Sequence, residues 1–132
     1  MRYMLDTNIC IFIINKKHMR VMEHLAAKRG SLIISAITLA ELEHGVAASA
    51  FIEQNALALM HFMAIARCLP FSHHAAAEYG EIRANLQRRG KLIGPLDMLI
   101  AAHAKSEGLT LVTNNTREFE RVEGLMFEDW VN

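Results

Sequence analysis

The chain has 132 residues, a length that fits one domain with a substantial hydrophobic core. Apolar residues make up 52% of it and charged residues 21%, which excludes an intrinsically disordered chain. The 14 basic and 14 acidic side chains cancel, so only local basic patches could hold a polyanionic partner. No apolar run is long enough to span a membrane, and Cys10 and Cys68 form no zinc or disulfide framework. We therefore expect a cytoplasmic protein with a single domain over residues 1–132.

Strand-like and helical patterns alternate in the first half of the chain. Residues 2–6 predict a short buried strand, and residues 9–14 and 19–26 predict two helices, the second ending near residues 28–30. Residues 31–35 are rich in β-branched side chains and predict a second strand, followed by a helix over residues 37–46. Residues 51–67 predict a further helix. Residues 68–71 predict an edge strand, because Pro70 lacks the N–H that a central strand needs.

The same alternation continues in the second half. Residues 75–89 predict a helix that Gly90 stops, and Pro95 begins another helix that ends at Gly108. Residues 109–113 predict a strand, residues 117–121 a short helix, and residues 125–130 an edge strand. Strands separated by helices favour parallel pairing with helices covering the sheet, so the predicted fold class is α/β.

Three acidic residues, Asp6, Glu41 and Asp97, interrupt apolar segments. A carboxylate among apolar neighbours is costly to desolvate unless it is paired or binds a metal. Asp6 ends the first predicted strand, and Glu41 and Asp97 lie early in helices that begin at the carboxyl edge of a parallel sheet. Ligands of open α/β sheets bind at that edge. The topology therefore predicts one shared acidic pocket.

A pocket of carboxylate oxygens suits Mg²⁺ or Mn²⁺, which take a few carboxylates and keep several waters. Without a cation, the carboxylates would repel one another and at least one pKa would rise. Such a cation polarises a phosphoryl group and activates water. The pattern therefore predicts metal-dependent phosphodiester chemistry.

Each acid also has a purely structural interpretation. Asp6 is placed to cap the following helix, and Asp97 lies in a first helical turn, where the helix dipole favours a negative charge. Glu41, beside Glu43 and His44, fits an ordinary solvated helix surface. Each of these structural roles remains possible for its own residue. That all three acids have only structural roles is less probable than one common pocket.

Four segments together resemble the PIN-domain ribonucleases: residues 4–8 (MLDTN), 35–45 (SAITLAELEHG), 93–104 (IGPLDMLIAAHA) and 111–119 (LVTNNTREF). Residues 124–130 complete a match that covers nearly the whole chain and is closest to the VapC-type toxins of bacterial type II toxin–antitoxin (VapBC) systems. The resemblance implies a PIN-like α/β/α sandwich with a central parallel sheet and a pocket for Mg²⁺ or Mn²⁺. Asp6, Glu41 and Asp97 match the family's three invariant acids, which implies catalytic and metal-binding roles for them.

The resemblance also shows a departure. Many relatives carry a fourth acid just after the last core strand, where this chain has Asn114 and Asn115. Glu118 or Glu120 could replace it, or Asn114 could contribute through a hydrogen bond or water. We therefore expect one firmly held metal and a weaker or substrate-dependent second one. Groups expected to orient the acids are Thr7, Asn8 and Thr113.

For function, the resemblance implies an endoribonuclease that cleaves a structured RNA such as tRNA and so inhibits translation. The implied partner is a VapB-like antitoxin that neutralises the toxin and, through its own DNA-binding domain, brings operator DNA into the complex. A toxin homodimer within this hetero-oligomer is also implied, with no membrane partner.

Two other functions compete with this one. The missing fourth acid would fit a catalytically weakened PIN module that acts mainly as an antitoxin partner and co-repressor. A phosphatase of the haloacid-dehalogenase type normally needs a second Asp two residues after the first, and Asn8 stands there. Seven histidines invite a zinc site, but no HExxH motif is present and the His73 and His74 side chains would diverge on a helix.

The candidates for RNA contact form a basic group that leads directly into the Asp97 segment: Arg83, Arg88, Arg89 and Lys91. A solvated helix end explains the same charges equally well. His44 and His103 are expected at the surface or the edge of the core. Apolar residues on more than one face of the predicted helix at residues 51–66 indicate a partner groove or a dimer surface.

Overall fold

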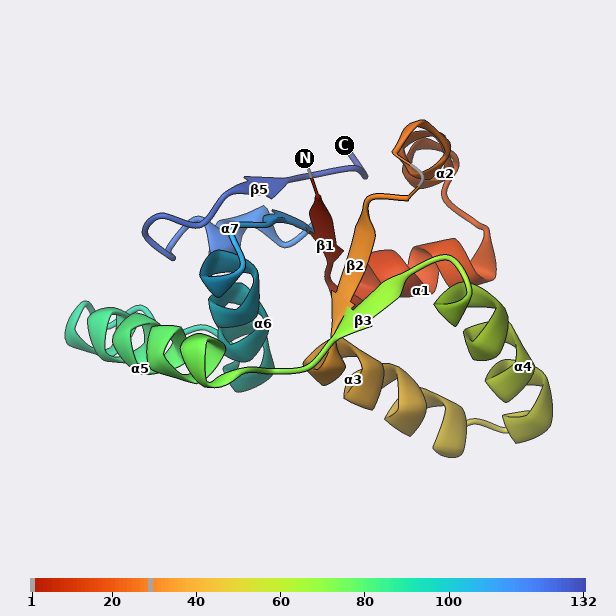
Figure 1. The fold of residues 1–132 in the computed structure, drawn as a ribbon, viewed down its shortest axis with the longest axis horizontal. Coiled ribbons are helices and arrows are strands. Elements are labelled where there is room, and N and C mark those ends of the chain that lie inside the picture. Colours follow the sequence, from red (N-terminus) through yellow and green to blue (C-terminus); the bar gives the residue numbers. More distant parts are fainter. Residues whose placement is uncertain (1, 29) are drawn as a thin grey trace.

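The computed structural model describes residues 2–28 and 30–132, and its centre is a parallel sheet with strand order β3-β2-β1-β4-β5 (Figure 1). Met4 of the central strand is paired with Ile33 on one side and Leu111 on the other. The strands are β1 (Tyr3–Leu5), β2 (Leu32–Ser35), β3 (Arg67–Leu69), β4 (Thr110–Val112) and β5 (Phe127–Glu128). The α/β class and the central parallel sheet are confirmed.

Helices cover both faces of this sheet, as parallel pairing requires. Figure 1 shows α1, α2 and α4 to one side of the strands and α5 and α6 to the other. The helices are α1 (Thr7–Asn15), α2 (Met19–Ala27), α3 (Ala36–Ala47), α4 (Ile52–Met63), α5 (His73–Arg88), α6 (Pro95–Ser106) and α7 (Thr116–Phe119). Among the described residues, no helix is long and apolar enough to cross a membrane.

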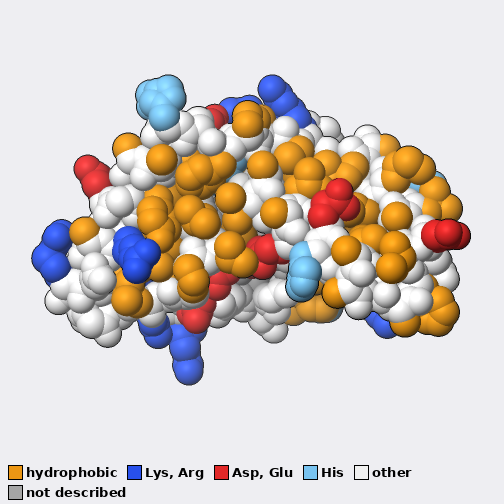
Figure 2. Space-filling view, turned by 90° about the horizontal axis from the view of Figure 1, so that it is seen from below, with side chains coloured by type: hydrophobic (Ala, Val, Ile, Leu, Met, Phe, Trp, Pro, Cys, Tyr) orange, Lys and Arg blue, Asp and Glu red, His pale blue; other side chains and the backbone are white. Residues whose placement is uncertain are grey.

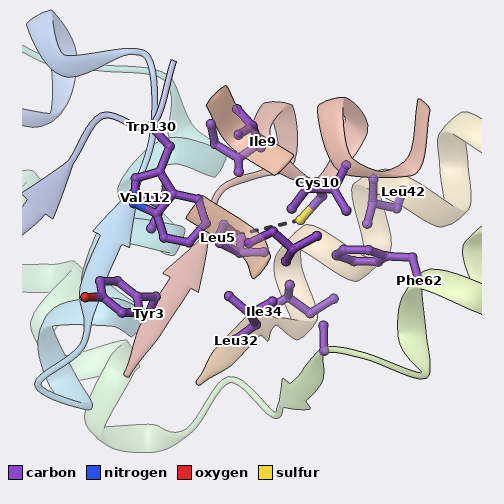
Figure 3. Close-up of a cluster of buried hydrophobic side chains, with 14 of the residues drawn as sticks. Tyr3, Leu5, Ile9, Cys10, Leu32, Ile34, Leu42, Phe62, Val112 and Trp130 are labelled. Atoms are coloured by element: carbon purple, nitrogen blue, oxygen red, sulfur yellow. Dashed lines mark hydrogen bonds between the residues drawn. The ribbon is translucent and has the colours of Figure 1, made fainter. Parts of the chain in front are cut away.

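The buried side chains form two hydrophobic layers, one on each face of the sheet. Tyr3 and Leu5 join the layer under α1, α2 and α4, whereas Met4 joins the layer under α5 and α6. Neighbouring side chains of a strand point to opposite faces, so a buried run of three residues feeds both layers. Figure 3 shows the first layer, in which Phe62 of α4 and Leu42 of α3 reach the strand residues.

Side-chain caps set where several helices begin. The carboxylate of Asp6 accepts a hydrogen bond from the Ile9 amide at 3.0 Å, so α1 begins at Thr7 rather than at the predicted Ile9. Ser72 likewise accepts from the Ala75 amide at 3.2 Å and starts α5 at His73, two residues before the prediction.

The predicted helix over residues 51–67 is wrong at its carboxyl end. The amides of Ala64 and Ile65 bond three residues back, which tightens the last turn and ends α4 at Met63. Arg67 then begins β3, where it pairs with Ile33 of β2. The boundary depends on the edge of β2, which residues 67–69 pair with, and helical periodicity in the sequence does not indicate that pairing. The predicted end of the second helix includes Arg29, which lies outside the described residues.

Candidate active site

Four carboxylates come together at the carboxyl edge of the sheet. Asp6 directly follows β1, Glu41 lies in the second turn of α3, and Asp97 lies in the first turn of α6. Glu118 comes from α7, the one-turn helix after β4. Figure 2 views the molecule from this edge, with acidic side chains gathered near the middle of the face and hydrophobic ones around them.

Asp6 is the most deeply placed of the four, with 5% of its surface exposed. Burial raises the pKa of its carboxyl group, and the negative charge of Glu41 acts in the same direction. Hydrogen bonds from the Thr113 side chain and from the Ile9 amide offset part of this rise. Asp6 therefore caps α1 and also lies in the acidic pocket beside Glu41. Its position fits both the structural role and the metal-binding role predicted for it.

Glu41 is held from the other side of the pocket. The Thr7 hydroxyl donates to Glu41 Oε1 at 2.6 Å, which joins the first residue of α1 to α3. Thr7 directly follows Asp6, so this bond ties Glu41 to the segment that carries the deepest acid.

Asp97 and Glu118 form a close acidic pair. The pKa of Asp97 rises from 3.8 to about 7, first through burial, then through the hydrogen bond and charge of Glu118, and further through Asp6 and Glu41. Gly94 lies tightly against this carboxylate, since a Cβ at that position would stand 3.2 Å from Asp97 Oδ2.

Asn115 connects this pair to the buried Asp6. Its side-chain amide donates to Glu118 Oε2 at 2.9 Å, and its backbone amide donates to Thr113 Oγ1 at 2.9 Å. Thr113 in turn bonds Asp6. The residues after β4 therefore link Glu118 to the buried end of the pocket.

The structure separates the candidates for the fourth acid. Glu118 lies beside Asp97, whereas Glu120 is exposed at the end of α7. Asn114 is half-buried, and no hydrogen bond within the described ranges joins it to the acids. Asn8 contributes a backbone amide to Asp6, while its side chain is exposed.

A divalent cation fits this donor set by its chemistry and charge. Every side-chain donor is a carboxylate oxygen, the kind of ligand that Mg²⁺ and Mn²⁺ prefer. Across residues 2–28 and 30–132, no lysine or arginine makes an ion pair with the four acids. In the same residues, no three His, Cys, Asp or Glu side chains stand close enough to hold a metal as they lie. The acids therefore have unbalanced negative charge, and a cation would have to draw them closer.

The predicted RNA-contacting residues divide into two kinds. Arg83 donates to the Tyr79 hydroxyl at 2.9 Å, and Arg89 binds three acceptors at the end of α5. The Arg88 and Lys91 side chains are exposed, and neither forms a hydrogen bond or ion pair with another group of the described chain. Several basic side chains in Figure 2 lie toward the α5 end of the face.

Two hollows open beside the acids, the first between α1, α3 and α4 and the second between α1, α3 and the start of α6. One, of about 470 Å³, is lined by Leu42, Val46 and Leu59 among others, and the other, of about 520 Å³, by Ile37 and Leu96 among others. Ile11 and Glu41 line both, so an apolar surface continues into the acidic pocket. Near these hollows, α4 exposes several large apolar side chains: Ile52, Leu57 and Met60.

Sequence reasoning missed one buried polar link, and its placement of His103 is wrong. His103 is fully buried in α6, with Nδ1 2.7 Å from Ser35 Oγ, and Phe71 packs edge-on against its ring. Burial lowers the pKa of His103, so the ring is neutral near pH 7. Ser35 Oγ also accepts from the Ile37 amide at 3.0 Å and caps α3. The link joins the helix of Asp97 to the start of the helix of Glu41. In the sequence, the apolar residues on both sides of His103 were the one indication that its side chain is buried.

Comparisons with known proteins show the family and the fold of the chain. The PIN domain family model matches residues 3–125. The tRNA(fMet)-specific endonuclease VapC of Shigella flexneri is 47% identical, and Ribonuclease VapC2 of Haemophilus influenzae is 44% identical, each over 98–99% of both chains. Among solved structures, DNA-bound VapBC from Salmonella typhimurium has a TM-score of 0.94 at 43% identity over 98% of both chains. VapBC2 from Rickettsia felis, bound to a promoter DNA fragment, has a TM-score of 0.93 at 42% identity, over 98% of this chain and 99% of that one. The chain belongs to the PIN-domain family, among its VapC-type ribonuclease toxins.

Proposed function

We propose that residues 1–132 act as a single PIN domain and as a Mg²⁺- or Mn²⁺-dependent endoribonuclease. The observation that carries this proposal is the convergence of four carboxylates, from four separate segments, with no lysine or arginine paired to them in the described chain. A purely structural cluster would be expected to be neutralised from within, because uncompensated buried charge is costly. The acids need a partner from outside the chain.

The proposed substrate is a structured RNA, with tRNA as the class to test first. The Shigella relative, named as a tRNA(fMet)-specific endonuclease, supports this choice through 47% identity over 98% of both chains. Cleavage of a tRNA removes it from translation, so expression of the active toxin should arrest protein synthesis. Arg88 and Lys91 have the exposure that phosphate contacts need.

Each acid has a distinct part in this proposal. Asp6, Glu41 and Asp97 hold one cation firmly, and Glu118 takes the place of the fourth acid and supports a weaker or substrate-dependent second cation. When bound, the cation polarises the scissile phosphodiester and lowers the pKa of a water molecule. The Thr7 and Thr113 hydroxyl groups orient Glu41 and Asp6. In the metal-free protein the pKa of Asp97 is raised to about 7, so binding of the cation would displace a proton from this carboxyl group near neutral pH.

Matched carboxylate-to-amide variants test the catalytic assignment. Asp6→Asn and Asp97→Asn should lose RNA cleavage and growth arrest while keeping the far-UV circular dichroism spectrum of the wild type. Glu120→Gln removes the same charge from an exposed position and should retain cleavage. Chelation by EDTA should stop RNA cleavage by the wild type, and added Mg²⁺ or Mn²⁺ should restore cleavage. Unchanged cleavage by both Asp variants would refute the catalytic assignment of Asp6 and Asp97.

The proposed protein partner is a VapB-like antitoxin, with operator DNA joining only through it. The solved VapBC complexes of relatives support this partner, two of them containing DNA. We place an antitoxin segment on the apolar surface that runs from α4 past Ile11 to Glu41. A basic side chain at its end would neutralise the acids. We also propose that the toxin is a homodimer within this assembly, and that the complex is cytoplasmic.

A substitution on this surface separates binding from cleavage. Ile11→Asp should weaken co-purification with the antitoxin encoded beside the toxin gene, while the exposed control Glu81→Gln, in α5, should not. Retained antitoxin affinity in the Ile11 variant would show that the antitoxin does not bind at this surface.

A catalytically weakened co-repressor remains the second candidate. Asn114 standing where relatives carry an acid motivates it. Glu118 beside Asp97 argues against it, because the acidic set is completed from α7. A weakened module would bind the antitoxin and RNA but show no turnover at any Mn²⁺ concentration.

A further inference from the structure

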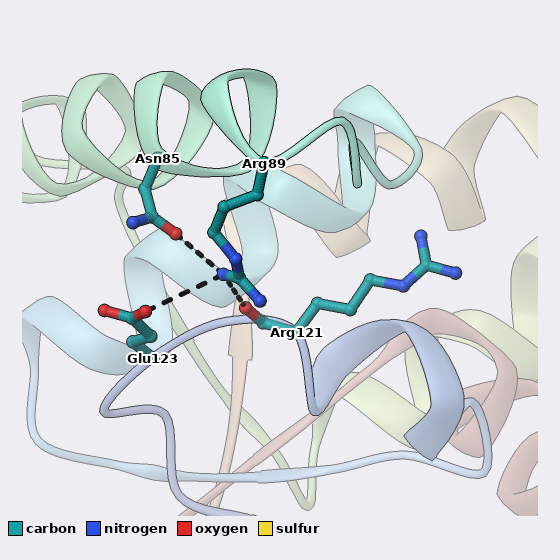
Figure 4. A network of polar contacts seen from close by, with 4 residues as sticks. All are labelled: Asn85, Arg89, Arg121 and Glu123. Atoms are coloured by element: carbon teal, nitrogen blue, oxygen red, sulfur yellow. Dashed lines mark hydrogen bonds and ion pairs between the residues drawn. The ribbon is translucent and has the colours of Figure 1, made fainter.

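Arg89 forms a junction between two loops that flank the acidic pocket (Figure 4). Its Nη1 donates to Asn85 Oδ1 at 2.8 Å and to the Arg121 carbonyl oxygen at 3.0 Å, and it lies 3.8 Å from Glu123 Oε1. Arg121 completes a second tie, because its Nη1 donates to the Leu92 carbonyl oxygen at 3.2 Å. Two arginine side chains therefore cross between the loop after α5 and the turn after α7.

These two loops position the close acidic pair. Residues 90–94 lead from α5 to Asp97, and Gly94 leaves little space beside the Asp97 carboxylate. The turn after α7 begins at Glu120, and the Arg121 amide donates to the Glu118 carbonyl oxygen at 3.1 Å. Because α7 has a single turn, its orientation depends strongly on what holds its end. A shift of one loop against the other would change how closely Asp97 approaches Glu118.

We propose that Arg89 and Arg121 are positioning residues that hold the segments of Asp97 and Glu118 together, so that a divalent cation can draw the two carboxylates in at little cost. The inference rests on the proposed function in one respect, that these carboxylates bind the cation. It replaces the predicted phosphate-contacting role of Arg89. The engaged guanidinium favours positioning, because a phosphate-contacting arginine does not need three acceptors from two segments of its own chain.

Electrostatics alone makes the opposite prediction for cation affinity. Removing an arginine near an acidic pocket removes a positive charge, which should strengthen Mn²⁺ binding slightly or leave it unchanged. Loss of positioning should weaken Mn²⁺ binding instead. The sign of the change therefore separates the two explanations.

The test compares Arg89→Ala and Arg121→Ala with Arg88→Ala, which removes the same charge from the neighbouring exposed residue. Mn²⁺ affinity is measured by calorimetry without RNA, at a temperature where near-UV circular dichroism shows each variant folded. We expect a loss of about 3- to 10-fold for Arg89→Ala and Arg121→Ala, smaller than the loss typical of groups that touch ligands directly. Arg88→Ala should not lose affinity, and Arg89→Lys should recover part of it.

Kinetics supply the second readout. In limiting Mn²⁺, Arg89→Ala should lower kcat with little change in the KM for RNA, and excess Mn²⁺ should restore kcat. A raised KM with wild-type Mn²⁺ affinity would overturn the inference and make Arg89 a phosphate contact. An equal loss of Mn²⁺ affinity in Arg88→Ala would also overturn it. A wild type that binds Mn²⁺ without cleaving RNA would refute the proposed function and leave the positioning role intact.

Discussion

The acidic pair predicts an unusual pH dependence of stability in the metal-free protein. Burial and Glu118 raise the pKa of Asp97 to about 7, whereas the unfolded chain releases this proton near the ordinary value of 3.8. Between these values, the folded protein binds more protons than the unfolded chain. The free energy of unfolding should therefore fall as pH rises from about 4 to about 7, contrary to the usual effect of a salt-bridged carboxylate.

The magnitude follows from the pKa difference and the exposure of the group. A change of one pKa unit corresponds to about 1.4 kcal/mol, but Asp97 is only half-buried and solvent screens its neighbours. After this reduction, we expect Asp97 to contribute about 1–2 kcal/mol to the loss of stability across the interval.

Urea unfolding in EDTA at several pH values from 4.5 to 8 measures this effect. The wild type should lose about 1–2 kcal/mol more than Asp97→Asn over that range, while the exposed control Glu53→Gln should follow the wild type. Added Mn²⁺ should stabilise the wild type more at pH 8 than at pH 5, because only the deprotonated acids bind it. Parallel curves for the wild type and Asp97→Asn would refute the argument that these carboxylates repel one another.

Three further predictions concern the groups around the pocket and the core beneath it. Thr113→Val removes the hydrogen bond to Asp6 and should raise the apparent Kd for Mn²⁺ about 10-fold, measured by calorimetry; unchanged affinity would remove Thr113 from the site. Ser35→Ala leaves His103 Nδ1 without its partner and also removes the cap of α3, so it should lower the free energy of unfolding by about 1–3 kcal/mol in urea titrations. In a His103→Ala background, the loss should shrink to the part due to the cap. Phe62→Ala empties a core position and should cost about 3–5 kcal/mol, whereas a similar cost for the exposed Met60→Ala would contradict the burial of α4.

Much of the fold was predictable from local pattern. Buried runs bounded by turn residues identify the strands at Tyr3–Leu5 and Leu32–Ser35, and their separation by helices requires parallel pairing. The boundary of α4 was not predictable, because residues 64–67 continue a helical pattern. Only the exposed edge of β2 draws Arg67 into a strand.

The sequence by itself also determined the acidic pocket in outline. Asp6, Glu41 and Asp97 are conspicuous because a carboxylate in an apolar segment needs compensation, and strand-end topology gives the three one common edge. These inferences depend only on position along the chain and on the rules of parallel sheets.

Only the tertiary structure decided among chemically equivalent residues. Glu118 lies in the one-turn helix α7 and Glu120 directly follows it, and packing directs the first toward Asp97 and leaves the second in solvent. Arg88 and Arg89 are adjacent, yet only Arg89 meets acceptors brought from residues 121 and 123. Such choices depend on contacts between segments far apart in sequence, and local composition carries no record of those contacts.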